Sequence, residues 1–312
     1  MGNNRIYYAI QQVAMKNASD SVYTAIHGLQ NISSSAGFNI VPVNELGKDS
    51  ISTTLPDGQD IQFSCNKVLD GYPLVYSIVT DNISYVASGI LQKSDLAISI
   101  FSDNNISATG NALITLLSSG LYITSLRYNF PNNGNFQEEI SFAGSNRRWS
   151  LDVFNGVFNN NDEPETNVNR RQDMSFWNGS SPINSTLPSE IPSGSHISSI
   201  SVSTSISYEE VPQLGSIIPS CKIPHLPLET TTEIVVSATG TDSVSTILNA
   251  FCVASGFAPQ PILLKTCEGT TINLGSGNKL ISTSSQGGGI DGGIISYNYT
   301  YKTYESSFIS HI

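Results

Sequence analysis

The sequence predicts a mainly β protein with two tandem antiparallel β-sandwich or half-barrel domains, each with one flanking helix. Three observations support this fold class. A diverged copy of one stretch returns half a chain later, several stretches alternate apolar with polar residues, and only 12% of the 312 residues are charged. Alternation is typical of half-buried strands, and an ordered internal repeat indicates a duplicated fold. The polar surface must therefore come mainly from hydroxyls and amides.

The repeat is anchored by NISSSAGFNIVPVNELG at Asn31–Gly47, which matches SISVSTSISYEEVPQLG at Ser199–Gly215 at a constant offset of 168 positions. Further matches follow in the same order along both halves: Leu55-Pro56 with Leu226-Pro227, Ile61-Phe63-Cys65 with Thr232-Ile234-Val236, Gly110 to Ile114 with Gly277 to Ile281, and Tyr128 to Phe130 with Tyr297 to Tyr299. We therefore expect a first domain over 1–149 and a second over 195–312. The segment between them, 150–194, has no match and is expected to be an Asn/Pro/Ser-rich linker or surface excursion, pinned by Phe176 and Trp177.

The first half begins with RIYYAIQQVAM at residues 5–15, which fits either a strand or an arm packing on a neighbour. Alternation from Ile26 to Val43 predicts a long half-buried strand. Residues 44–60 contain Gly47, Pro56 and Gly58 and predict a long hairpin loop, with a short strand over 50–54.

The next elements are a strand over 60–68 and a helix that begins at Asp70, with Pro73 in its first turn. In the second half, Asp242 is predicted to cap a helix over 243–253, whose apolar residues have helical spacing: Val244, Ile247, Leu248 and Phe251. Each helix is expected to cover one face of its sheet.

The remaining stretches predict strands separated by Asn, Ser and Gly. In the first half these strands cover 96–101, 112–117, 121–130 and 136–144, with a break at Ser118-Ser119-Gly120 and a turn at 131–134. The second half ends in 297–304, where tyrosines alternate with polar residues, as in a strand that faces an apolar surface.

Charge and cysteine usage exclude several classes of protein. The chain has 25 acidic and 14 basic residues, a net charge of −11, so it is not expected to grip nucleic acid. The four cysteines lack CxxC spacing, and neither a disulfide framework nor a zinc site is expected: Cys65, Cys221, Cys252 and Cys267. No apolar run is long enough to span a membrane, and no signal peptide opens the chain.

The chain is not expected to be an enzyme, and we predict no catalytic, cofactor-binding or metal-binding residues. The histidines form no ligand set, because His27 and His196 hold matching structural positions and His225 and His311 stand apart. The pairs Glu138-Glu139 and Glu209-Glu210 lie in predicted strands, where neighbours point to opposite faces and do not converge on one bond. They are expected to lie on solvated strand faces.

Three stretches of the first half resemble the tail tube proteins of tailed bacteriophages: IHGLQNISSSAGFNIVPVNELG, DIQFSCNKVLDGYPLVY and SGLYITSLRYNFPNNGNFQEEISFAGSNRRW. The third carries a strand, a turn at Phe130 to Gly134, then Glu138 or Glu139, then Phe142 and Gly144. The resemblance covers residues 26–149 and reaches the second half through the repeat.

This resemblance implies a virion structural protein, assembled in the host cytoplasm, whose sheets join those of neighbouring subunits to line the hollow tail tube. An acidic lumen would let DNA pass during ejection without tight binding. The duplication favours rings in which three chains supply six domains, a pseudo-hexamer, with a hexamer of chains as the alternative. Partners would be stacked copies of the ring and other tail proteins: a sheath if the tail is contractile, a tape measure, a baseplate and a terminator.

Two other functions remain open from the sequence. A tail hub or tail-end baseplate protein also uses tandem tube domains. A carbohydrate-binding adhesin module would use aromatic strands, and the chain has 13 Tyr but only two Trp. An enzyme ranks third, because no set of residues supports one.

Overall fold

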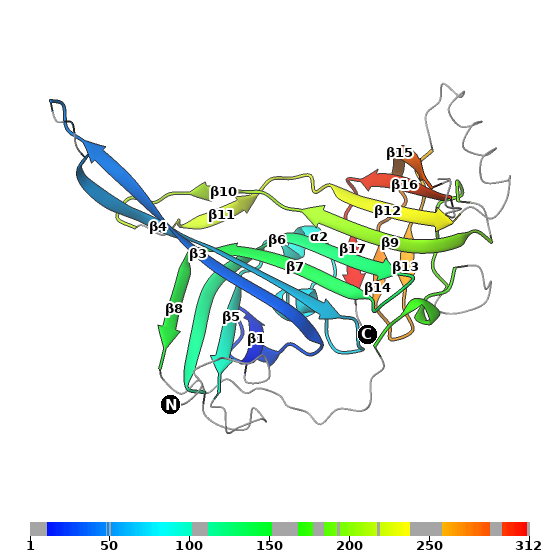
Figure 1. Ribbon diagram of the computed structural model, residues 1–312, viewed down its shortest axis with the longest axis horizontal. Coiled ribbons are helices and arrows are strands. Elements are labelled where there is room, and N and C mark those ends of the chain that lie inside the picture. Colours follow the sequence, from blue (N-terminus) through cyan, green and yellow to red (C-terminus); the bar gives the residue numbers. More distant parts are fainter. Residues whose placement is uncertain are drawn as a thin grey trace.

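The fold is mainly β and antiparallel, as predicted. The computed structural model describes residues 11–47, 49, 51–101, 112–151, 168–176, 184–191, 194–216, 219–237, 258–287 and 295–310. In these ranges the helices are short, whereas the strands are long and numerous (Figure 1). No helix in the described ranges is long and apolar enough to cross a membrane.

One continuous path of eight strands runs through the main sheet, in the order β3-β4-β7-β6-β9-β12-β16-β15. The first four strands come from the first half of the chain: β3 Leu29–Asn44, β4 Ile51–Val68, β7 Gln137–Gly144 and β6 Ile114–Pro131. The other four come from the second half: β9 His196–Ser205, β12 Thr230–Ser237, β16 Ser296–Thr303 and β15 Lys279–Gln286. Each half thus contributes a four-stranded unit in which the strands follow the same order, first, second, last and second last.

Strand β6 belongs to two sheets. Its first residues pair with β5 (Ser94–Ile100) and β8 (Asn146–Ser150), and its last residues pair with β7 and β9. Beyond β5 the second sheet continues with β1 (Gln11–Asn17) and β2 (Thr24–Ala25). The prediction of separate strands over 112–117 and 121–130 was therefore wrong. Gly120 adopts a left-handed φ of 68°, so the strand bends at this point while its hydrogen-bonded ladders continue.

The expected loop over 44–60 is also largely strand. Strand β4 already begins at Ile51 and pairs with β3 out to Asn44, so the loop itself spans only residues 45–50. Pairing with β7 begins at Ile61, and among the described strands the part of β4 before it pairs only with β3. Proline is tolerated in a strand that has a neighbour on one edge, which fits Pro56.

The remaining strands form smaller sheets in the second half. A hairpin joins β10 (Tyr208–Val211) to β11 (Cys221–Pro224), and a three-stranded sheet contains β13 (Leu263–Lys265), β14 (Thr271–Asn273) and β17 (Phe308–Ser310). The predicted final strand is β16. Its alternation is as expected, since Tyr299 and Tyr301 are buried.

The helix of the first half does not begin at Asp70. Asp70 instead forms a buried ion pair with Lys67, and α1 spans Val75–Val79 without a side-chain cap. The N–H groups of Val75 and Tyr76 donate to the two carboxylate oxygens of Glu138, at 2.7 and 3.1 Å. A second short helix, α2 (Val86–Gly89), follows. The predicted helix over 243–253 lies outside the described residues.

Glu138 is therefore buried, whereas the sequence predicted a solvated position for it. It also accepts a 3.0 Å hydrogen bond from the Tyr128 hydroxyl. Burial raises the pKa of Glu138, while the bonded N–H groups and the nearby Lys67 oppose that rise. A single carboxylate from β7 thus fixes both the start of α1 and a tyrosine of β6.

Two described stretches lie between the halves, one bound to the first half and the other to the second. The N–H of Asn169 donates to Leu69 O, and its carbonyl accepts from Phe136 N–H, which inserts this residue into the first half. Further along, Thr186 exchanges backbone hydrogen bonds with Leu263 of the second half. Phe176 packs against the core, whereas Trp177 lies outside the described residues. The boundaries at 149 and 195 stay a prediction.

Removing the Glu138 carboxylate should strongly destabilise the fold. In Glu138→Ala, two helix N–H groups and the Tyr128 hydroxyl would lose a partner and the buried Lys67 would lose a nearby opposite charge, so we expect a loss of about 3–5 kcal/mol in the free energy of unfolding. Urea denaturation measures this change. Glu139, the next residue along β7, points to the opposite face and supplies the control. Glu139→Ala should lower the free energy of unfolding by less than about 1 kcal/mol. Equal losses from both variants would contradict the role assigned to Glu138.

Candidate assembly interface

The junction between the two four-stranded units is an ordinary antiparallel strand pair. Residues 125–131 of β6 lie opposite residues 199–205 of β9, with Tyr128 facing Val202 and Phe130 facing Ile200. All four of these side chains are buried. The pairing is extended by backbone hydrogen bonds at both ends, from Ile206 to Thr124 and from Asn132 to Ser198. The chain thus joins two sheet units edge to edge without a break in the core.

Tyr208 marks the place where β5 and β9 diverge from the same edge of β6. Its hydroxyl lies 2.7 Å from Ile123 O and 3.0 Å from Ile90 O. Its ring packs at 5.3 Å from that of Tyr122, and burial raises the pKa of Tyr208. The hydroxyl has a single proton, and its shorter contact donates that proton to Ile123 O, which lies between the end of the β5 pairing at Leu121 and the start of the β9 pairing at Ser125.

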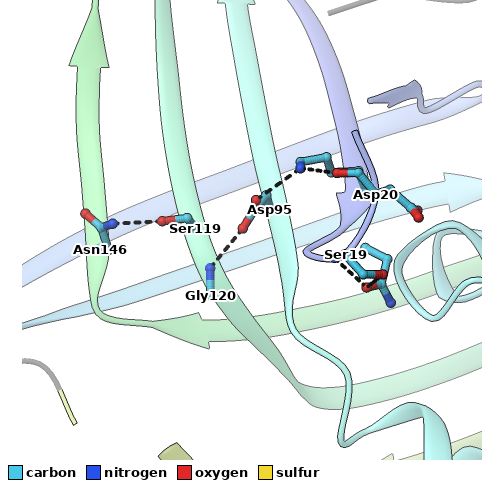
Figure 2. Close-up of polar contacts among 8 residues, drawn as sticks. Ser19, Asp20, Asp95, Ser119, Gly120 and Asn146 are labelled. Atoms are coloured by element: carbon cyan, nitrogen blue, oxygen red, sulfur yellow. Dashed lines mark hydrogen bonds and ion pairs between the residues drawn. The ribbon is translucent and has the colours of Figure 1, made fainter. Parts of the chain in front are cut away.

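The bend of β6 is held by polar contacts across neighbouring strands. Figure 2 shows Asn146 reaching Ser119, and Gly120 reaching Asp95. The Gly120 N–H donates to the Asp95 carboxylate at 3.0 Å, and Lys16 of β1 lies 3.6 Å from the other oxygen of that carboxylate. Together these contacts connect four strands at the point where the two sheets part.

The face of the main sheet that points away from the core is lined by hydroxyls and amides. Cross-strand register places the following side chains on it: Ser33, Ser35, Gln62, Ser64, Ser125, Ser141, Ser201, Ser203, Thr231, Asn298 and Thr300. A shallow pocket of about 380 Å³ lies on its first half, between Ser33 and Ala143.

Charges on this face are few and nearly balanced. Among the described residues of its strands, the acidic side chains on this face are Asp60, Glu139 and Glu233, and the basic ones are Arg127, Lys279 and Lys302. Arg127 and Glu139 lie directly opposite each other, and Lys302 forms an ion pair with Glu229. This face therefore carries nearly equal numbers of acidic and basic side chains, and the acidic lumen stays a prediction.

Two hairpins extend from the sheet toward the same side of the molecule (Figure 1). Leu46 at the tip of the β3–β4 hairpin and Leu214 at the tip of the β10–β11 hairpin are fully exposed, at 103% and 101%. Each is followed by a glycine with a left-handed φ, 89° at Gly47 and 86° at Gly215. The repeated Leu-Gly motif therefore builds the same exposed apolar tip twice.

The residues considered for chemistry do not converge. His27 stacks on Tyr72 at 3.7 Å, His196 and His225 are exposed, and His311 lies outside the described residues. Glu209 and Glu210 are exposed, as expected. Cys65 is buried in the core, where desolvation raises its pKa, and Cys252 lies outside the described residues. The described part of the chain contains no group of His, Cys, Asp and Glu that could hold a metal ion.

Sequence reasoning missed the residues that make the junction. Tyr208 and Tyr128 appeared only as members of strand patterns, because their partners lie far away in the sequence. The one available signal was the motif around Glu138, which resembled a family pattern without indicating burial.

Comparisons with known proteins give distant structural neighbours. No family model and no curated protein matches the chain. Among solved structures it is similar to the cap of the anti-feeding prophage (13% identity, TM-score 0.37), covering 49% of this chain and 95% of that one. It is also similar to the sheath/tube terminator of an extracellular contractile injection system, PVC, in the extended state (15% identity, TM-score 0.37, covering 48% and 99%). A third neighbour comes from the virion of a native gene transfer agent particle (14% identity, TM-score 0.31, covering 48% and 100%). Similarity at this level carries no argument about what this chain does.

Removing the Tyr208 hydroxyl should loosen the fork between β5 and β9. In Tyr208→Phe, the Ile123 carbonyl loses the hydroxyl that donates to it, so we expect the free energy of unfolding to fall by about 1–2 kcal/mol. Tyr85, which is 56% exposed, offers a matched control, and Tyr85→Phe should change stability by less than about 0.5 kcal/mol. Chemical denaturation of both variants measures the difference. A Tyr208→Phe protein as stable as the Tyr85→Phe protein would show that the hydroxyl bonds contribute nothing.

Proposed function

We propose that this chain is a structural subunit of a phage-type tail tube, and that copies of it associate into stacked rings around a channel. The observation that supports the proposal is the pair of four-stranded units with the same strand order, joined edge to edge through β6 and β9. A protein that lines a tube must repeat one sheet unit around an axis. This chain already makes one such step within itself.

The duplicated units also favour a stoichiometry. If each unit takes one of six positions around the axis, three chains complete the ring as a pseudo-hexamer. Closed rotational symmetry of this kind is common in homo-oligomers. A hexamer of chains would place twelve units around the axis and enclose a wider channel.

We assign the hydroxyl- and amide-lined face to the channel. The opposite face packs against α1 and the second sheet and forms the core, so it is already covered. A face with few and balanced charges lets DNA pass because it offers phosphate no cluster of cations to bind. The channel lining therefore acts through sparse charge and not through acidic repulsion.

The alternatives from the sequence receive less support. Of the four tyrosines in the final strand pattern, Tyr299 and Tyr301 are buried in the core and cannot stack on a sugar, Tyr297 is half-buried, and Tyr304 alone is exposed. A hub or tail-end protein would share the tandem units but would stop at a single ring. Other tail proteins, such as a sheath, a tape measure or a terminator, would be partners in either case.

Negative-stain electron microscopy of the purified full chain tests the proposal. Stacked tubes are expected for a tube subunit. Single rings that never elongate would favour the hub, and a strictly monomeric protein at all concentrations would contradict both assembly functions. Rotational averaging of end views would separate three chains from six.

The two hairpin tips should mediate stacking between rings. Their exposed leucines have no cover in the isolated chain, and a neighbouring ring would bury them. In the double variant Leu46→Asp, Leu214→Asp we expect folded rings but at least a tenfold loss of tubes, because two charges would enter an apolar contact. Microscopy and sedimentation measure this loss. The exposed Val22, outside the hairpins, gives the control, and Val22→Asp should leave tube length unchanged. Normal tubes from the hairpin variant would exclude this contact.

Assembled protein should bind double-stranded DNA weakly even at low salt. The test adds cations to the proposed channel face in the variant Ser201→Lys, Ser203→Lys. If two lysines each reach a phosphate, the slope of log affinity against log salt should steepen by about 1.8. The control Ser201→Asn, Ser203→Asn keeps the face neutral and should bind as weakly as the unchanged protein. Tight, salt-sensitive binding by the unchanged protein would overturn the conduit assignment.

A further inference from the structure

The main sheet ends in two edges that carry almost no charge. Strand β3 forms one edge, and residues 29–40 of this strand include no Lys, Arg, Asp or Glu. Strand β15 forms the other, and its single charged residue is Lys279 at its start. Natural proteins normally protect long exposed edges with charges, prolines or bulges, because an open edge pairs with other chains. The ladders at both edges contain bulges, at Leu29/Asn31, Phe38/Ile40 and Val43/Asn44 of β3 and at Leu280/Ser282 of β15, and β3 also contains Pro42. The regular stretches between these interruptions, 31–38 and 282–286, carry no charge, so they are open to pairing with another strand.

The exposure of apolar side chains along the sheet shows that each edge strand lacks a neighbouring strand. On β9, which β6 covers, Ile200 and Val202 are 1% and 4% exposed. On β3, Ile32 and Ala36 point to the same side of the sheet and remain half-exposed. The other edge shows the same contrast, since Leu126 of β6 is buried whereas Leu280 of β15 is half-exposed. Each edge strand thus resembles an inner strand that has lost one neighbour.

We infer that β15 of one copy pairs antiparallel with β3 of a second copy, and that this contact repeats the β6–β9 junction inside the chain. In the shared strand order, β15 holds the place of β6 and β3 holds the place of β9. The inference rests on the proposed function and specifies the partner, a second copy of this chain, and the two edges that meet.

The internal junction also distinguishes this contact from the simplest alternative, a pair of β3 strands from two copies. Pairing β3 with β3 of another copy would be isologous and would stop at a dimer. Pairing β15 with β3 joins different surfaces, so each copy leaves one edge of each kind free until a ring closes. Only this arrangement continues the strand order that the chain shows within itself.

Disulfide trapping tests the contact. Ser285 of β15 and Ala36 of β3 point to the core side of the sheet, because they lie opposite Tyr297 and Ile61. Side chains directly opposite each other at a non-hydrogen-bonded site of an antiparallel pair have Cβ atoms about 4.5 Å apart, at the upper end of the range for a disulfide. Ser285→Cys protein would be mixed in turn with Ser34→Cys, Ala36→Cys and Phe38→Cys protein, assembled and oxidised. Mass spectrometry would identify the linked peptides.

We expect one of these three mixtures to give a linked dimer with at least tenfold higher yield than the matched control. The control replaces Ser285→Cys by Ser284→Cys, whose side chain lies opposite Asn298 on the other face of the sheet. Rings or tubes that form without any Ser285 link would overturn the edge assignment and leave the proposed function standing. A β3-to-β3 link in Ala36→Cys protein alone would also overturn the assignment. If no assembly forms at all, the proposed function fails with it.

Discussion

The backbone ladder of β6 is the constraint on which the rest of the structure depends. This 18-residue strand is hydrogen-bonded to β5 and β8 along its first part and to β7 and β9 along its last part. It therefore belongs to both sheets and to both halves of the chain. Because successive residues of a strand point to opposite faces, a one-residue shift in the pairing of β6 would expose the core residues of both units at once.

Polar groups that are buried or half-buried keep this arrangement in one register. The Glu138 carboxylate ties α1 to β7 and β6, the Tyr208 hydroxyl fills the fork where β5 and β9 diverge, and Asp95 holds the bend at Gly120. An unpaired buried polar group costs more than an apolar contact gains, so each of these contacts favours one arrangement of strands over its alternatives. The hydroxyls and amides of the outer face do not carry this cost, because they point away from the core.

The strands were largely predictable, and the errors have identifiable causes. Alternation predicted β3 and β16, because a half-buried strand shows its period in the sequence itself. Ser118-Ser119-Gly120 and the Pro56 region appeared to be breaks, since local propensity does not register that a strand bends or has only one neighbour. Asp70 and Glu138 were assigned to a helix cap and to solvent because the buried Lys67 and the α1 N–H groups that surround them approach only in the folded chain.

The sequence by itself determined the class of the fold, the recurrence of the Leu-Gly motif and the shortage of clustered cations, because each of these is a local pattern or a count. Only the tertiary structure decided that β6 pairs with β9, that Leu46 and Leu214 lie at hairpin tips, that the Ser- and Asn-rich side of the sheet faces outward with nearly balanced charge, and that β3 and β15 remain as edges with almost no charge. These features depend on which strands lie side by side. Strand neighbours are chosen by contacts between residues far apart in the chain, and no local pattern records them.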